Sequence, residues 1–117
     1  MKVILKASVD VDQQFLSSWL RPGKEYVVLS IEQLKNAAAF RLASENEGQP
    51  VLFEVGLFDV SERSLAKSWV ALGIQEGIVE LGPEEFASPS FLEQVFDHEL
   101  HALITYRVVM ERILIES

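Results

Sequence analysis

The sequence predicts an α+β fold, in which helices pack against a small, strongly bent antiparallel sheet. The first observation is the turn Pro22-Gly23, which leads into a run, 25–31, rich in β-branched and aromatic residues. Proline presets φ at one turn position and glycine accepts positive φ at the next, so this run is predicted to be the central strand. The second observation is a series of short apolar segments separated by glycine and proline. The third is Ser88-Pro89, where serine suits a helix cap and proline the first helical position.

Composition limits the classes of protein to which the chain can belong. With 117 residues, 49% hydrophobic and 24% charged, residues 1–117 are predicted to form one globular domain with a sizeable core. No apolar run is long enough to cross a membrane, and Met1–Lys6 is too short and too charged for a secretory signal. Cysteine is absent, which excludes thiol chemistry, and the reducing cytoplasm is the expected compartment. A net charge of −8 argues against DNA or RNA as a direct partner.

Before the central strand, residues 2–9 alternate loosely between apolar and polar side chains and are predicted to form the first strand. A short helix is predicted to follow up to Leu20, with Asp10 or Asp12 as its cap. The apolar stripe of that helix would be Phe15, Leu16, Trp19 and Leu20. Both tryptophans, Trp19 and Trp69, are expected in the core because apolar positions flank them.

After the central strand, residues 32–39 fit a helix, a loop or a short turn. Residues 40–45 alternate and are predicted to be a strand, and the turn residues of 46–50 are predicted to end it. The apolar run 51–60 has Gly56 near its middle. A glycine within a strand pattern indicates a bulge or a bend between two short strands.

Two further strands are predicted in the second half, at 68–72 and 77–81, with residues 73–76 joining them. Gly82-Pro83 ends the strand pattern.

The C-terminal part contains one clear helix signature and one ambiguous stretch. The helix begins at Ser88, or at Ser90 if Glu93 completes a capping box with it. Its buried face is predicted to be Phe91, Leu92, Val95 and Phe96. Residues 98–117 fit a helix or a strand, and we predict a helix because the stretch is long. The polar stripe of that helix would be His98, His101, Thr105, Arg112 and Glu116.

No motif in the chain predicts a catalytic residue or a cofactor. His98 and His101 lie one residue closer together than the two histidines of a helical zinc motif, and one turn earlier Gln94 is a poor ligand. Nucleophile elbows and phosphate-binding loops are absent from the sequence. Glu84-Glu85 is better explained by helix-dipole and solvent interactions than by acid–base catalysis.

Charge is distributed unevenly along the chain. Between Arg41 and Arg107 the only basic residues are Arg63 and Lys67, while this span holds twelve of the eighteen acidic residues. We expect a negatively charged surface there that contacts a partner, and the alternative is an ordinary solvated face. The candidate contact residues lie on the least basic stretch: Glu76, Glu80, Glu84 and Glu85.

Several segments resemble small bacterial proteins that are often encoded beside polymorphic toxins and act as immunity proteins. The resembling segments are Trp19–Ile31, Phe40–Leu42, Gly48–Phe53, Leu57–Val60, Ser68–Val70, Leu81–Phe86 and Ser90–Asp97. Contact-dependent growth inhibition systems are one setting for such proteins. The start Gly23–Leu29 followed by Gly48–Val60 also resembles an SH3-like barrel, which implies a partial barrel with helices added after it.

This resemblance implies a cytoplasmic inhibitor that binds one cognate toxin domain without a cofactor or catalytic residue. Many such toxin domains are nucleases with basic clefts, which an acidic inhibitor could cover with favourable electrostatic complementarity. One alternative is a small-molecule-binding or enzymatic domain with a pocket lined by Trp69, Tyr26 and acidic residues. Another is a homo-oligomeric structural module. The gene neighbourhood would distinguish these three hypotheses, because an immunity gene should follow its toxin gene.

We predict that the protein has no hydrolase activity, because its nucleophiles, bases and metal-ligating residues lack workable spacing. A screen for esterase, phosphatase and nuclease turnover should give background rates. Turnover that disappears in Glu84→Ala or His98→Ala would contradict this prediction.

Overall fold

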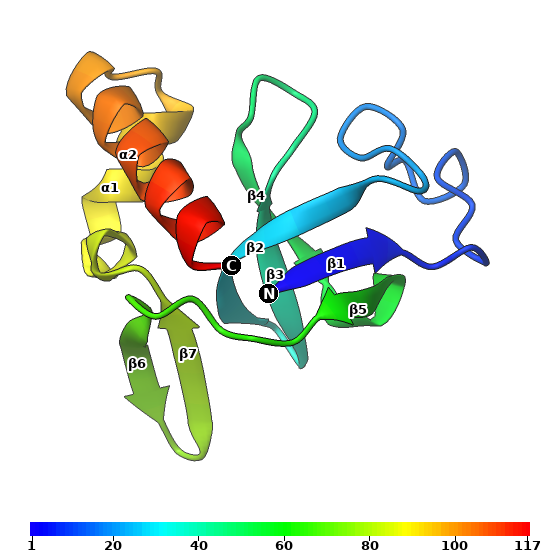
Figure 1. The fold of residues 1–117 in the computed structure, drawn as a ribbon, viewed down its shortest axis with the longest axis horizontal. Coiled ribbons are helices and arrows are strands. Elements are labelled where there is room, and N and C mark those ends of the chain that lie inside the picture. Colours follow the sequence, from blue (N-terminus) through cyan, green and yellow to red (C-terminus); the bar gives the residue numbers. More distant parts are fainter.

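The computed structural model describes residues 1–117 and confirms the α+β class, with seven strands and two α-helices (Figure 1). The strands are β1 (Lys2–Leu5), β2 (Glu25–Leu34), β3 (Ala37–Ala43), β4 (Pro50–Glu54), β5 (Phe58–Glu62), β6 (Val70–Gln75) and β7 (Ile78–Gly82). The helices are α1 (Pro89–Phe96) and α2 (Leu100–Glu116), with short 3-10 turns η1 (Val55–Leu57) and η2 (Glu84–Ala87). Neither helix combines the length and apolar character needed to span a bilayer.

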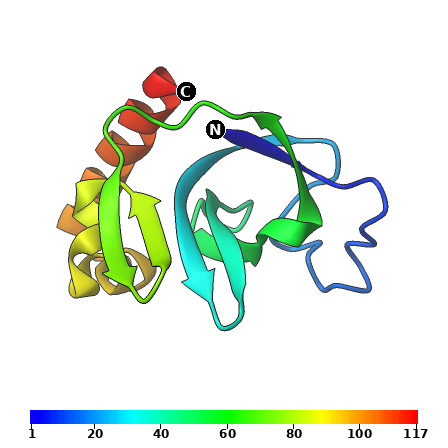
Figure 2. The ribbon, with the colours of Figure 1, turned by 90° about the horizontal axis from the view of Figure 1, so that it is seen from below.

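Strand β2 is the central strand of the antiparallel sheet, as predicted. Its first part, Glu25–Val27, pairs with β1, and its later part pairs with β3 on one edge and with β7 at Ile31. Because a strand has only two edges, β1 and β7 occupy the same edge of β2 at different points along it. The main path of the sheet is β4-β3-β2-β1-β5 and does not close into a barrel. The strong curvature of β2 is visible in Figure 2.

Two hydrophobic cores lie on opposite faces of β2. Val28 is fully buried in one core and Leu29, the next residue, is 2% exposed in the other, because successive side chains of a strand point to opposite faces. The first core lies within the bent sheet: Val3, Leu5, Leu20, Tyr26, Val28, Phe40, Leu42, Phe53 and Phe58. The second joins the sheet to the helices: Leu29, Ala66, Phe86, Phe91, Val95, Ala102, Tyr106, Val109 and Ile113.

A buried ion pair fixes the β2–β3 hairpin. Arg41 donates from Nε and Nη2 to the carboxylate of Glu32 at 2.6 and 2.9 Å, and from Nη1 to the Pro50 carbonyl at 2.7 Å. The Ser30 hydroxyl donates to the same carboxylate at 2.6 Å. Burial alone would raise the pKa of Glu32, but the hydrogen bonds from Arg41 and Ser30 outweigh it and lower this pKa. The carboxylate therefore stabilises the fold above its ordinary value of 4.5, and this contribution is lost as pH falls through the lowered pKa.

The predicted helix before Leu20 is wrong: this segment forms consecutive turns. Asp10 does cap a turn, since its carboxylate accepts from the backbone N–H groups of Asp12 and Gln13 at 3.0 and 3.2 Å. Phe15 then adopts φ 57° with 84% of its surface exposed, which ends any helical run. A helix this short is marginal unless a full apolar face is buried, and of the predicted stripe only Leu20 is buried.

Cross-strand pairing decides the ambiguous hairpin segments. Residues 32–39 belong to β2 and β3, joined by a two-residue turn at Lys35-Asn36. The strand predicted at 40–45 is β3, which begins earlier, at Ala37, and ends at Ala43. The bend between two strands within 51–60 is confirmed, with η1 at the bend. The β6–β7 loop is shorter than predicted. It is Glu76-Gly77, both with positive φ, which is the geometry of a tight hairpin turn.

The helix predictions are confirmed in position and corrected in detail. α1 begins after Ser88, whose side chain makes no capping hydrogen bond, and Phe96 is 36% exposed instead of buried. α2 confirms the helical interpretation of the C-terminal stretch. Trp19 and Trp69 are only half-buried, because they pack at the margins of the cores.

We predict that Arg41→Met lowers the free energy of unfolding by about 3–5 kcal/mol, because it leaves the Glu32 carboxylate buried without its partner. Arg21→Met is the matched control, since the Arg21 side chain is 74% exposed and Glu45 keeps Lys24 as a partner, so the 3.4 Å pair should contribute less than about 1 kcal/mol. Urea titrations measure both. Equal losses in the two variants would contradict the structural role of the buried pair.

Candidate protein-binding surface

The four acidic residues predicted to contact a partner do not form one cluster of free carboxylates. Glu76 is exposed in the β6–β7 turn, and Glu84 is exposed at the start of η2. The five residues of β7, about 17 Å of extended chain, lie between them. Glu80 accepts from the backbone N–H of Gln33 at 2.8 Å, and Glu85 accepts from Arg112 at 2.7 and 2.9 Å. Only Glu76 and Glu84 are therefore exposed and without a hydrogen-bonding partner.

The Glu85–Arg112 pair connects η2 to α2. The hydrogen bond from Arg112 is the main cause of the lowered pKa of Glu85, although partial burial opposes it. Both side chains are about one-third exposed. This carboxylate holds the helices in position and is not available to a partner.

The β6–β7 hairpin extends from the body of the molecule (Figure 1). It carries four exposed apolar side chains. Val70, Ile74, Ile78 and Val79 are 42%, 71%, 42% and 51% exposed. Ile74 and Val79 are cross-strand partners and so share one face of the hairpin. Ile78 pairs with Gln75 and Val70 with Gly82, and both lie on the other face of the hairpin. We call Ile74 and Val79 the hairpin patch. The sequence predicted the two strands but gave no signal that these apolar side chains would be exposed.

In addition to the pairing of Leu81 with Ile31, two features hold the hairpin against β2. The Glu80 carboxylate bonds the Gln33 backbone, as described above. At Gly82, a side chain has no space, because a Cβ there would lie 2.7 Å from the Ser30 Cβ and 2.9 Å from Leu72 Cδ1. Glycine thus permits the close approach of β7 to β2, while the tip of the hairpin remains exposed.

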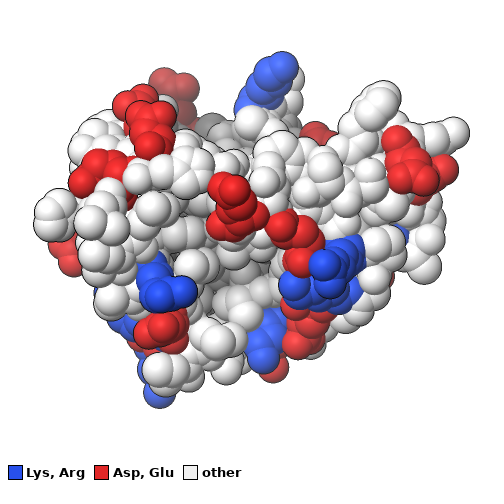
Figure 3. Space-filling view, turned by 90° about the horizontal axis from the view of Figure 1, so that it is seen from above, with Lys and Arg blue, Asp and Glu red and all other residues white.

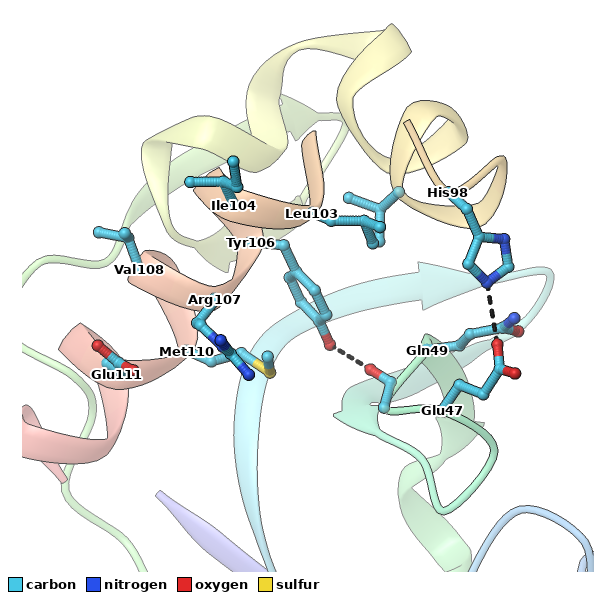
Figure 4. Close-up of a pocket in the computed structure, with 12 residues that line it drawn as sticks. Glu47, Gln49, His98, Leu103, Ile104, Tyr106, Arg107, Val108, Met110 and Glu111 are labelled. Atoms are coloured by element: carbon cyan, nitrogen blue, oxygen red, sulfur yellow. Dashed lines mark hydrogen bonds and ion pairs between the residues drawn. The ribbon is translucent and has the colours of Figure 1, made fainter. Parts of the chain in front are cut away.

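A groove of about 440 Å³ lies between α2 and the turn that joins β3 to β4 (Figure 4). On its floor, the Tyr106 hydroxyl donates to the Gly48 carbonyl at 2.7 Å. At one end, His98 Nε2 lies 2.9 Å from a carboxylate oxygen of Glu47. Burial raises the pKa of Tyr106, so its hydroxyl stays protonated and acts as a donor. The groove can accept an apolar side chain or small molecule, and its volume is typical of ligand sites.

This groove is not the pocket expected from sequence. Trp69 lines none of the cavities, and its indole N–H is buried without a partner. The Tyr26 hydroxyl is engaged elsewhere, since it donates to Glu45 at 3.0 Å and accepts from the Arg21 backbone at 2.7 Å. Neither residue is placed to line the α2 groove.

His98 has a structural position between the helices. It adopts φ 58° immediately after α1. Its backbone N–H bonds the Val95 carbonyl at 3.1 Å and that of Glu99 bonds the Gln94 carbonyl at 2.9 Å, which is the Schellman pattern that ends helices. Glu99 then caps α2 by accepting from the backbone of His101 and Ala102. No three His, Asp or Glu side chains in the chain come together as a metal site.

Half of the basic side chains are neutralised by ion pairs within the molecule. The paired residues are Lys2, Arg21, Lys24, Arg41 and Arg112, out of ten Lys and Arg. Figure 3 shows the result on one face: most basic groups lie beside acidic ones, and further acidic groups stand without a basic neighbour. The net charge of −8 means that acidic groups outnumber basic ones over the molecule as a whole.

Comparisons of the chain with protein-family models, curated proteins and solved structures return no match. Functional inference therefore depends on the residues and geometry described above.

We predict that Tyr106→Phe lowers the free energy of unfolding by about 1–2 kcal/mol, because the Gly48 carbonyl loses its donor. His98→Gly is the contrast. This variant loses the exposed pair with Glu47, but glycine adopts the positive φ of this position without steric strain. The free energy of unfolding should therefore change by less than about 1 kcal/mol. Thermal melts with calorimetry measure both effects. A Tyr106→Phe variant as stable as the native protein would show that water replaces this bond.

Proposed function

We propose that the protein is a cytoplasmic, non-catalytic immunity protein that binds and neutralises a basic toxin domain through the β6–β7 hairpin. The observation that carries this proposal is the exposed, apolar hairpin patch, which acidic residues flank in a stretch, 70–97, that contains no Lys or Arg. Resemblance to immunity proteins of polymorphic toxin systems supports the inhibitor class. This function requires no nucleic acid, membrane or cofactor.

The arrangement of side chains on the hairpin suits a protein interface. Specific interfaces have an apolar centre that excludes water and a polar rim that sets specificity. Ile74 and Val79 would form the centre, and Glu76 and Glu84 the acidic rim, while Glu80 and Glu85 hold the hairpin and helices in place. The binding role of the four predicted acidic residues is thus restricted to two of them.

Charge determines the kind of partner that this surface would accept. Every charged residue from Glu76 to Asp97 is acidic. A basic surface, such as the substrate cleft of a nuclease, would be attracted to it over a range set by salt screening. The association rate should therefore fall with added salt, while the dissociation rate should depend mainly on the apolar centre.

The proposal is tested with the product of the gene immediately upstream, which the proposed function requires to contain the toxin domain. We predict that Ile74→Lys with Val79→Lys weakens binding at least about 100-fold and abolishes protection of cells that express the toxin. Glu76→Lys with Glu84→Lys should mainly lower the association rate and its dependence on salt. Biolayer interferometry at several salt concentrations measures both rates.

A matched control uses the opposite end of the sheet. Asp59→Lys with Val60→Lys places two lysines on exposed positions of β5 and should leave binding and protection intact. Circular dichroism must show that all variants are folded. Protection by a folded Ile74→Lys, Val79→Lys variant would remove the hairpin from the interface.

The groove beside Tyr106 supports a second candidate function, the binding of a small molecule. Its volume and its apolar lining from Val95, Leu103 and Met110 favour this alternative. A fragment screen by NMR would detect it through shifts of these residues. Such binding with no effect on toxin neutralisation would assign the groove a separate role.

A further inference from the structure

The outer side of α2 is apolar although it faces solvent. Its inner side packs on the sheet and α1 through residues spaced about one turn apart: Ala102, Tyr106, Val109 and Ile113. A second set occupies the opposite side, with exposed fractions of 67%, 55%, 56%, 57% and 84%: Leu100, Ile104, Val108, Leu114 and Ile115. In Figure 4, Ile104 and Val108 point away from the turn that Tyr106 contacts. A helix that is apolar on both sides is normally covered on both sides.

Two opposite charges interrupt this outer stripe. Arg107 and Glu111 lie one turn apart beside Ile104 and Val108, and neither forms an ion pair within the molecule. A basic residue four positions before an acidic one is the less favourable order for pairing within a helix. Both charges are therefore available to a partner with the complementary pair.

We propose that α2 forms a homodimer with α2 of a second copy, packed antiparallel around a two-fold axis near the level of residue 109. In this arrangement Arg107 of each copy lies opposite Glu111 of the other, so two intermolecular ion pairs form by symmetry. Ile104 of each copy lies opposite Leu114 and Ile115 of the other. A parallel pairing is disfavoured, because it places Arg107 against Arg107 and Glu111 against Glu111.

The size of this surface indicates a reversible dimer. α2 has 17 residues and is therefore about 25 Å long. A pair of such helices buries less than the roughly 800 Å² per partner of a standard interface. We therefore expect the dimer to dissociate in the micromolar range. Because it uses α2 and not β6–β7, the dimer is independent of the toxin-binding proposal.

Sedimentation velocity of the native protein from low to high micromolar concentration tests the proposal. A concentration-dependent monomer–dimer equilibrium is expected. Arg107→Glu and Glu111→Arg, each alone, should weaken dimerisation at least about tenfold, because like charges then meet across the axis. The double variant with both changes should restore it. Ile74→Glu on the hairpin is the matched control and should leave the equilibrium unchanged.

A covalent test avoids dependence on charge substitutions. The native chain contains no cysteine, so Val108→Cys introduces a single thiol near the proposed axis. Under mild oxidation at a concentration where the native protein is partly dimeric, this variant should form disulfide-linked dimers far faster than Ile74→Cys. A monomeric native protein at high micromolar concentration, equal cross-linking rates, or failure of the charge exchange to restore dimerisation would each overturn the proposal.

Discussion

The structure depends on the limited number of edges and faces that β2 offers. Its ten residues pair with β3 along one edge, while β1 and β7 divide the other edge between them. Its two faces bury separate cores, with Val28 on one side and Leu29 on the other. The sheet must bend to enclose the first core, and the helices must cover the second. The ion pair between Arg41 of β3 and Glu32 of β2 connects the two strands at a point where both side chains are largely shielded from solvent.

The separation of the cores determines which surfaces remain free. Because β7 pairs with β2 only at Ile31, most of the β6–β7 hairpin lies beyond the sheet. Because the second core takes only the inner side of α2, the outer side of that helix has no neighbour. Both apolar surfaces therefore follow from the way neighbouring elements attach to β2.

Local sequence signals predicted the fold well wherever a turn residue or cap decided the outcome. Pro22-Gly23, Gly56 and Ser88-Pro89 each mark a real boundary. The errors arose where long-range packing decides. The segment before Leu20 has a cap and a helical stripe, but its apolar side chains pack on the first core from consecutive turns, and Phe15 remains exposed. The four acidic candidates lie close together in the sequence. In the fold, however, Glu80 and Glu85 accept hydrogen bonds from residues distant in the sequence, and the sequence alone does not show these contacts. Fourteen large hydrophobic residues are exposed, and a periodicity pattern cannot separate these from core residues.

Charge distinguishes the two apolar surfaces. The hairpin patch is accompanied by acidic residues alone, so two copies meeting through it would bring like charges together. The partner proposed for this surface is accordingly a basic protein of a different kind. The outer side of α2 carries one residue of each sign, Arg107 and Glu111, one helical turn apart. When two copies are related by a two-fold axis, Arg107 of each copy lies opposite Glu111 of the other, so this surface is complementary to itself. The outer side of α2 is therefore suited to a second copy of the chain, and the hairpin patch to a basic protein. The acidic net charge opposes self-association elsewhere on the surface, but the Arg107–Glu111 arrangement on α2 offsets this repulsion.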